Sequence, residues 1–284
     1  MTNPKILKEF WYDLTDDQRN VILNNCHEEY DKFLQGKDFD VEVVKKYFRV
    51  DDVKFINHAE EADLKLLNID IQLGADIHAN TDWALRYAAE HDHLDVVKYL
   101  VEQGADIHAD REHALRWAAN NGHLDIVKYL VGKGADVHAE EECALGCASK
   151  NGHLSVVKYL VKHGADIHED NNWALRVTAE NGHLNVVKYL VEQGANIHAE
   201  DDYAFRYAAE YGHLSVVKYL IEQGADIHAY DDGALRSAAE EGHLSVVKYL
   251  VENGASIHAG DEWALRWASN NDHPEVVEYL KSLG

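Results

Sequence analysis

The sequence predicts an all-α fold, a helical repeat solenoid whose short helices are joined by short turns or hairpin loops. The first observation is a period of 30 residues that runs through most of the 284-residue chain. The second is that each period contains two apolar stretches of helical spacing, each too short to be stable as an isolated helix. Because such a period is typical of stacked repeats, we expect each unit to bury its apolar face against its neighbours. A glycine opens each of seven copies: Gly74, Gly104, Gly134, Gly164, Gly194, Gly224 and Gly254.

The N-terminal segment, residues 1–50, does not repeat. Capping-box spacing that begins at Thr15 predicts a helix to Phe33, and Asp40 precedes a second helix through Phe48. Two interpretations stay open: a helical cap, or a small docking module such as a ubiquitin-ligase adaptor box. The cap is the simpler one, because an array needs polar outer faces at its ends.

Residues 51–73 are interpreted as a degenerate first repeat. Leu67 stands 30 positions before Val97 and keeps its apolar character. Asp70, in contrast, stands where the next copy has Leu100. We therefore expect a helical unit that closes the array with one polar residue at an otherwise apolar position.

Residues 74–284 contain the seven regular repeats. In the first copy the apolar spacing predicts a first helix over Trp83 to Glu90 and a second over Leu94 to Gln103. A turn then follows from Gly104 to Asp110, and its glycine supplies the left-handed residue that ends the helix. The side chain of Asp82, just before the first helix, is expected to cap free amides there.

These units resemble the ankyrin repeat. The motif is GHLNVVKYLVEQGANIHA from Gly182 to Ala199, together with an Ala-Ala pair in the first helix, and the resemblance covers residues 62–284. The units are three residues shorter than the family's usual repeat of about 33, and Trp83 to Arg86 replaces the family's Thr-Pro-Leu-His. The resemblance implies an ankyrin-type solenoid with short loops, which binds proteins on a concave face made of turn tips and first helices. The short, histidine-rich unit also looks like the mimivirus-like ankyrin proteins that giant amoeba viruses encode.

The seven copies differ from one another mainly in the first helix and the turn. Three variable columns lie four residues apart and therefore share one face of the first helix. One column changes from Trp83 to Cys143 to Gly233, and packed cores do not tolerate such changes of volume, so we expect partial exposure. The candidate partner-binding residues are the rings of these columns and acids of the turns: Trp83, Tyr87, Trp117, Trp173, Tyr203, Tyr207, Tyr211, Trp263, Trp267, Asp201, Asp231 and Glu141.

We expect the rings to gather in three clusters with recesses between them. In the alternative interpretation, the rings cover neighbouring first helices and add packing between units. The clusters are Tyr203, Tyr207 and Tyr211 beside Trp173, then Trp263 with Trp267, then Trp83, Tyr87 and Trp117; the recesses are at Cys143 with Cys147 and at Gly233 with Ser237.

The charge of the chain constrains its partners. Asp and Glu number 51 against 27 Lys and Arg, which gives a formal net charge of −24 and disfavours nucleic acid. Rings bordered by carboxylates suit a protein partner that offers basic and apolar groups. No apolar run is long enough for a membrane span. We also expect the protein to be a monomer.

The chemical motifs predict neither an enzyme nor a metal or cofactor site. The recurrent His78 and His93 flank a helix and lie too far apart to share an ion, so each is expected to bond nearby backbone. The cysteines, including Cys143 and Cys147, are predicted to be free thiols, which favours an intracellular, cytoplasmic location, in the host cytoplasm if the source is viral. Turn histidines beside acids are expected to bind protons more tightly, so a basic partner should bind more weakly at about pH 6 than at about pH 7.5.

Overall fold

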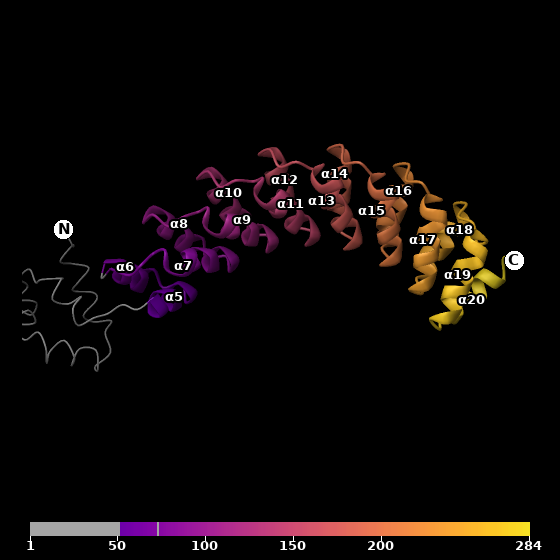
Figure 1. Ribbon diagram of the computed structural model, residues 1–284, viewed down its shortest axis with the longest axis horizontal. Helices are drawn as coiled ribbons and strands as arrows, with labels where there is room; N and C mark the ends of the chain where they lie inside the picture. Colours follow the sequence, from indigo (N-terminus) through magenta and orange to yellow (C-terminus); the bar gives the residue numbers. More distant parts are fainter. Residues whose placement is uncertain (1–51, 73) are drawn as a thin grey trace, which may run out of the picture. The chain divides into compact units, whose positions relative to one another are not determined.

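The computed structural model describes residues 52–72 and 74–284 (Figure 1). Every element in this part of the chain is a helix, and none is a strand, as the sequence predicts. The helices predicted after Thr15 and Asp40, and the choice between a cap and a docking module for residues 1–50, lie outside the described residues.

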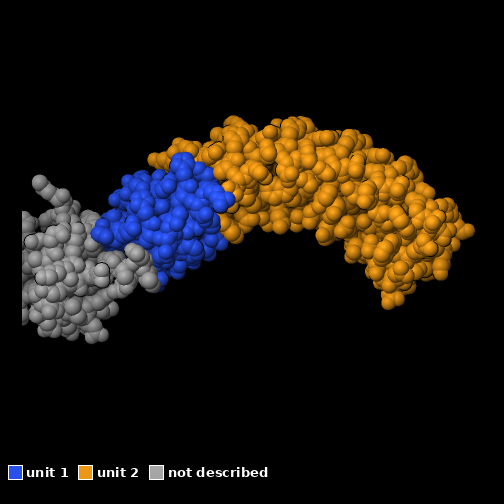
Figure 2. All heavy atoms as spheres, in the orientation of Figure 1, with its two compact units in different colours: residues 1–114 blue, residues 115–284 orange. Residues whose placement is uncertain are grey.

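The chain divides into two compact units, residues 1–114 and 115–284 (Figure 2). The boundary falls inside one helix, α9. Helices α5 to α8 belong to the first unit and α10 to α20 to the second. Their bounds are α5 Asp52–Glu60, α6 Leu64–Gln72, α7 Ala79–Glu90, α8 Leu94–Glu102, α9 Ala109–Asn120, α10 Leu124–Gly132, α11 Ala139–Lys150, α12 Leu154–Lys162, α13 Glu169–Glu180, α14 Leu184–Glu192, α15 Ala199–Glu210, α16 Leu214–Glu222, α17 Ala229–Glu240, α18 Leu244–Glu252, α19 Ala259–Asn270 and α20 Pro274–Lys281.

The first unit contains the helix pair α5 and α6, which packs on the pair α7 and α8. Phe55 and Leu67 are fully buried in it. Asp70 is buried as well, and its carboxylate lies 2.5 Å from Nδ1 of His58 on α5. A buried carboxylate requires such a partner, which explains how an acid occupies a position that is apolar in later copies.

In the second unit the helices form two rows (Figure 1). Each first helix, α11, α13, α15, α17 and α19, packs on the next, and these contacts are more extensive than those between the second helices. Buried Ala144 and Ala148 of α11 allow close approach, whereas Val156, Val157 and Leu160 fill the face of α12. The row of first helices lies on the inner side of this unit's curve.

Each first helix in the regular repeats opens with a left-handed turn. In α7, Asn80, Thr81 and Asp82 have φ of 51°, 59° and 55°, and right-handed helix follows from Trp83. Such a conformation costs about 1–2 kcal/mol for each residue with a β-carbon. The turn therefore depends on contacts made by the surrounding structure.

The predicted cap Asp82 has a different role. Its Oδ1 accepts a hydrogen bond from the backbone N–H of Asp106, in the next turn, at 2.8 Å. Nδ1 of His78 lies 3.1 Å from the same oxygen. The expectation that His78 bonds backbone is thus wrong, because the left-handed turn brings the buried carboxylate of Asp82 within hydrogen-bond distance of the imidazole nitrogen.

Two histidines that precede second helices, His153 and His213, bond backbone as predicted, and each bond reaches into the preceding repeat. Nε2 of His213 lies 2.8 Å from the carbonyl oxygen of Glu180. Its ring lies against Gly182, where an added β-carbon would be 2.5 Å from Nδ1. Gly182 also has φ of +77°, so both conformation and space require a glycine at this position.

Candidate functional site

The candidate site is the surface formed by the first helices and their turns, called here the first-helix surface. The second unit presents it on the inner side of the curve (Figure 1). Its rings range from half-buried to exposed. Trp117, Trp263 and Trp267 are each 37–39% exposed, whereas Tyr203, Tyr207 and Trp173 are half-buried.

Tyr203 and Tyr207 of α15 and Tyr211, the residue that follows this helix, form a ladder along this surface. The ring centroids of Tyr203 and Tyr207 are 3.7 Å apart with nearly parallel planes, and those of Tyr207 and Tyr211 are 6.4 Å apart. Burial, and then a hydrogen bond with Tyr207, raises the pKa of Tyr203 above its ordinary value. Tyr211 is 49% exposed, so a partner has most access to the end of the ladder that lies away from the turn.

The arginine column of the first helices lies against the rings. The guanidinium of Arg206 is 4.7 Å from the ring centroid of Tyr230, and that of Arg236 is 4.9 Å from Trp263. That of Arg176 lies 5.2 Å from Tyr203. The chain's own cations thus occupy ring faces that sequence reasoning assigned to a partner's cations.

The same arginines hold the left-handed turns. Nε of Arg206 donates to the carbonyl oxygen of Asp201 at 2.8 Å, and Nη2 donates to that of Glu200 at 3.1 Å. Arg86 bonds Thr81 and Asn80 in the same way in the first unit. These charge-assisted bonds help to offset the strain of the turn and fix the direction of its acids.

Trp173 follows the alternative interpretation, in which a ring covers a neighbouring first helix. Its six-membered ring fills the space beside Gly146, where an added β-carbon would overlap it. Gly146 is the position at which the other regular repeats carry arginine. The missing side chain therefore makes room for the ring.

The recess expected at Gly233 is filled. An added β-carbon there would stand 3.3 Å from Cδ of Arg206 and 3.3 Å from Cβ of Tyr230. Tyr230 itself is 60% exposed, more than any ring that the sequence analysis selected. Sequence reasoning missed it, although it is the one aromatic residue among the variable turn positions.

In the first unit, Trp83 and Tyr87 lie together with ring centroids 6.4 Å apart. Arg86 covers Trp83 at 5.2 Å, and Tyr87 stacks on His91 at 3.9 Å. Trp117, expected in the same cluster, belongs to the second unit, where it is exposed.

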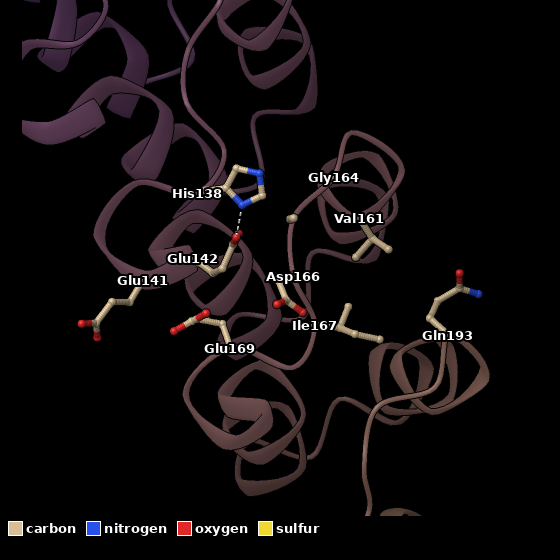
Figure 3. Close-up of a pocket in the computed structure, with 10 residues that line it drawn as sticks. His138, Glu141, Glu142, Val161, Gly164, Asp166, Ile167, Glu169 and Gln193 are labelled. Atoms are coloured by element: carbon tan, nitrogen blue, oxygen red, sulfur yellow. Dashed lines mark hydrogen bonds and ion pairs between the residues drawn. The ribbon is translucent and has the colours of Figure 1, made fainter.

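The exposed acids Glu141, Asp201 and Asp231 all lie in the left-handed turns. Glu141 also lines an open groove of about 720 Å³ between α11, α13 and the ends of α12 and α14 (Figure 3). Glu142, Asp166 and Glu169 bring further carboxylates to this groove, and His138 is the one imidazole in its lining. The groove suits a cationic group.

Glu142 and His138 form a hydrogen-bonded pair in the lining of this groove. Glu142 is buried, its Oε1 bonds Nδ1 of His138, and its Oε2 has no hydrogen-bond partner. The bond to Glu142 raises the pKa of His138; burial opposes the shift, while Asp136 and Asp166 add to it. The sequence analysis did not select Glu142, and the available signal was the His-x-x-x-acid spacing that recurs in the turns.

A second groove, of about 570 Å³, lies on the last repeat. Trp263, Trp267, Leu265 and Lys281 are among the residues that line it. It adds apolar area and a cation beside the predicted Trp263 and Trp267 pair.

Within residues 52–72 and 74–284, no group of three or more His, Cys, Asp or Glu side chains is placed to hold a metal ion. No helix in those ranges is long and apolar enough to cross a membrane.

Comparisons with known proteins agree with this geometry. The family description "Ankyrin repeats (3 copies)" matches residues 55–141, 115–201, 175–261 and 205–284. Among solved structures, the human ASB11 ankyrin repeat domain is similar, with a TM-score of 0.60 at 23% identity, over 69% of this chain and 96% of that one. A search of curated proteins finds no match to the sequence. The structural likeness establishes the fold, an array of paired helices.

Proposed function

This chain belongs to the ankyrin repeat family, and we propose that it is a non-enzymatic protein-interaction scaffold whose first-helix surface binds a protein partner with basic and apolar groups. Members of this family are generally protein-binding scaffolds. This assignment of the surface rests on one observation: half-exposed rings lie beside turns in which most of the exposed side chains are carboxylates.

The rings and the acids have different roles in binding. Exposed rings such as Tyr211 and Tyr230 supply apolar area, which stabilises a complex through burial. The ring of Tyr230 is partly covered by Arg206 and Arg236, so the partner meets mainly its edge and guanidinium groups there. The partner's cations are drawn instead to the carboxylates of the turns and to the groove beside Glu142.

We place this scaffold in the cytoplasm, acting as a monomer. Cys143 and Cys147 are free thiols, and a reducing compartment preserves that state. The net charge of −24 disfavours self-association through mutual repulsion.

The test compares two variants of equal charge change. One carries Glu141→Gln, Asp201→Asn and Asp231→Asn on the turns; the control carries Glu192→Gln, Glu222→Gln and Glu252→Gln on the second helices, where these residues are also exposed. We expect proteins captured from a cell extract by the native chain to be lost with the turn variant and kept with the control. Equal recovery by both variants contradicts the assignment of the surface.

A third variant tests the rings. Tyr211→Ala, Tyr230→Ala and Trp267→Ala remove exposed rings and leave the half-buried Tyr203 and Trp173 in place. The loss of several rings of a binding surface is expected to weaken capture at least about tenfold. Unchanged capture, with an unchanged circular dichroism spectrum, contradicts a role for the rings.

A further inference from the structure

The sulfur atoms of Cys143 and Cys147 lie 3.4 Å apart on α11. Both side chains are half-buried and occupy columns that hold Tyr203 and Tyr207 one turn apart on α15. Trp173 covers α11 on the side of Gly146. The two thiols therefore face each other on a surface that remains open to small solutes.

The charged surroundings make the two thiols unequal. Arg116 of α9 hydrogen-bonds Cys143, while Glu140 of the turn and Lys150 at the end of α11 act more weakly on the pair. Hydrogen bonding from Cys147, with help from Arg116, lowers the pKa of Cys143 to about 6. Hydrogen bonding to Cys143 and burial raise the pKa of Cys147, so Cys143 is the thiolate and Cys147 is the donor.

We propose that Cys143 and Cys147 form a peroxide-reactive two-thiol site, in which Cys143 is oxidised first and Cys147 then closes a reversible disulfide. In the first step the Cys143 thiolate attacks a hydroperoxide. A sulfur–oxygen bond forms, the oxygen–oxygen bond breaks, and the leaving alkoxide or hydroxide takes a proton from water. The product at Cys143 is a sulfenic acid.

In the second step Cys147 attacks the sulfenic sulfur. A sulfur–sulfur bond forms, the sulfur–oxygen bond breaks, and the departing hydroxide takes the thiol proton of Cys147 and leaves as water. The peroxide has then accepted two electrons from the two thiols. Oxidation of Cys143 also removes the negative charge that holds the proton on Cys147, so the first step prepares the second.

The disulfide is expected to be easily reduced. Residues four apart on a helix have β-carbons about 5–6 Å apart, whereas a disulfide holds them at about 3.5–4.5 Å. Closing the bond therefore distorts α11, and strained disulfides return readily to thiols. The distortion falls within the first-helix surface, so it provides a way for oxidants to change that surface.

The test uses the full chain with Cys26→Ser, so that no third thiol competes. One equivalent of hydrogen peroxide should cause a mass loss of two hydrogen atoms, located by peptide mapping to a Cys143–Cys147 bond and reversed by dithiothreitol. With Cys147→Ser added, the reaction should stop at a sulfenic acid on Cys143 that dimedone captures. The chain itself carries Ser237 at the position equivalent to Cys147, so this substitution is compatible with the fold.

Two further measurements compare the reactivity of the two thiols. Iodoacetamide should alkylate Cys143 at least about ten times faster than Cys147 near neutral pH. The rate at Cys143 should reach half of its maximum near pH 6, as its lowered pKa requires, and should shift to higher pH with Arg116→Gln. Equal alkylation rates, a peroxide product confined to sulfinic acid, or only disulfide-linked dimers would overturn the proposal.

Discussion

The ring of Trp173 occupies the space beside Gly146, one first helix away, where any larger residue would overlap it. Adjacent repeats are thus matched to one another at individual positions, although their sequences are nearly the same.

Gly146→Ala should destabilise the chain although alanine is the better helix former. We expect a net loss of up to about 2 kcal/mol, because overpacking costs about 1–3 kcal/mol and helix propensity returns about 1 kcal/mol. In a Trp173→Ala background the same change should stabilise by about 1 kcal/mol. Gly233→Ala is the control: its β-carbon would meet neighbours at 3.3 Å, against 1.8 Å for Gly146, so it should be less destabilising than Gly146→Ala in the native background. Urea denaturation measures the four variants and the native chain, and an equal effect of Gly146→Ala in both backgrounds contradicts the contact.

Gly182→Ala and His213→Ala should be energetically coupled. Gly182→Ala brings a β-carbon to 2.5 Å from the imidazole, so removing that ring first should reduce its cost. A double-mutant cycle should give a coupling of about 1–2 kcal/mol. Gly152 contacts His183 instead, so Gly152→Ala with His213→Ala should be additive within about 0.5 kcal/mol. Additivity in both cycles would show that the Gly182 contact has no energetic effect.

His138→Gln should destabilise the chain more at about pH 5.5 than at about pH 8. The pKa of His138 is raised in the folded state by Glu142, so its stabilising contribution is complete below the unfolded pKa of about 6.5 and is lost as pH rises through the folded value. His168 bonds the neutral Asn172 at 3.2 Å and serves as the matched control. Urea midpoints at the two pH values should diverge for His138→Gln and stay parallel to wild type for His168→Gln. The same pH dependence for both variants would exclude the Glu142 pairing as its cause.

Thr81→Asn should stabilise the first regular turn. Thr81 is β-branched and exposed, yet it has φ of 59°, a conformation that asparagine adopts at lower cost. We expect a gain of about 0.5–1 kcal/mol, seen as a higher urea midpoint. Asp231→Asn changes the equivalent position, where the native residue already tolerates φ of 54°, and should stay within about 0.5 kcal/mol. No gain for Thr81→Asn would mean that the turn carries no conformational strain.

The sequence determined the repeat, the helices and the core. A period of 30 residues placed the second helix at Leu94 to within one residue at its end, and the start of right-handed helix at Trp83 matches the structure. The buried Val96, Val97 and Leu100 follow directly from helical spacing. Such features depend on residues three or four apart, so a single copy already contains the information.

Only the tertiary structure decided which partners the polar groups and the rings contact. Asp82 accepts its backbone hydrogen bond from Asp106, 24 residues away, rather than from its own helix. The left-handed turns, the arginines on the ring faces and the place of Trp173 on Gly146 likewise depend on a neighbouring turn or repeat. Each of these side chains is locally compatible with several arrangements. Packing between neighbouring repeats selects one of them, and no local sequence pattern encodes that packing.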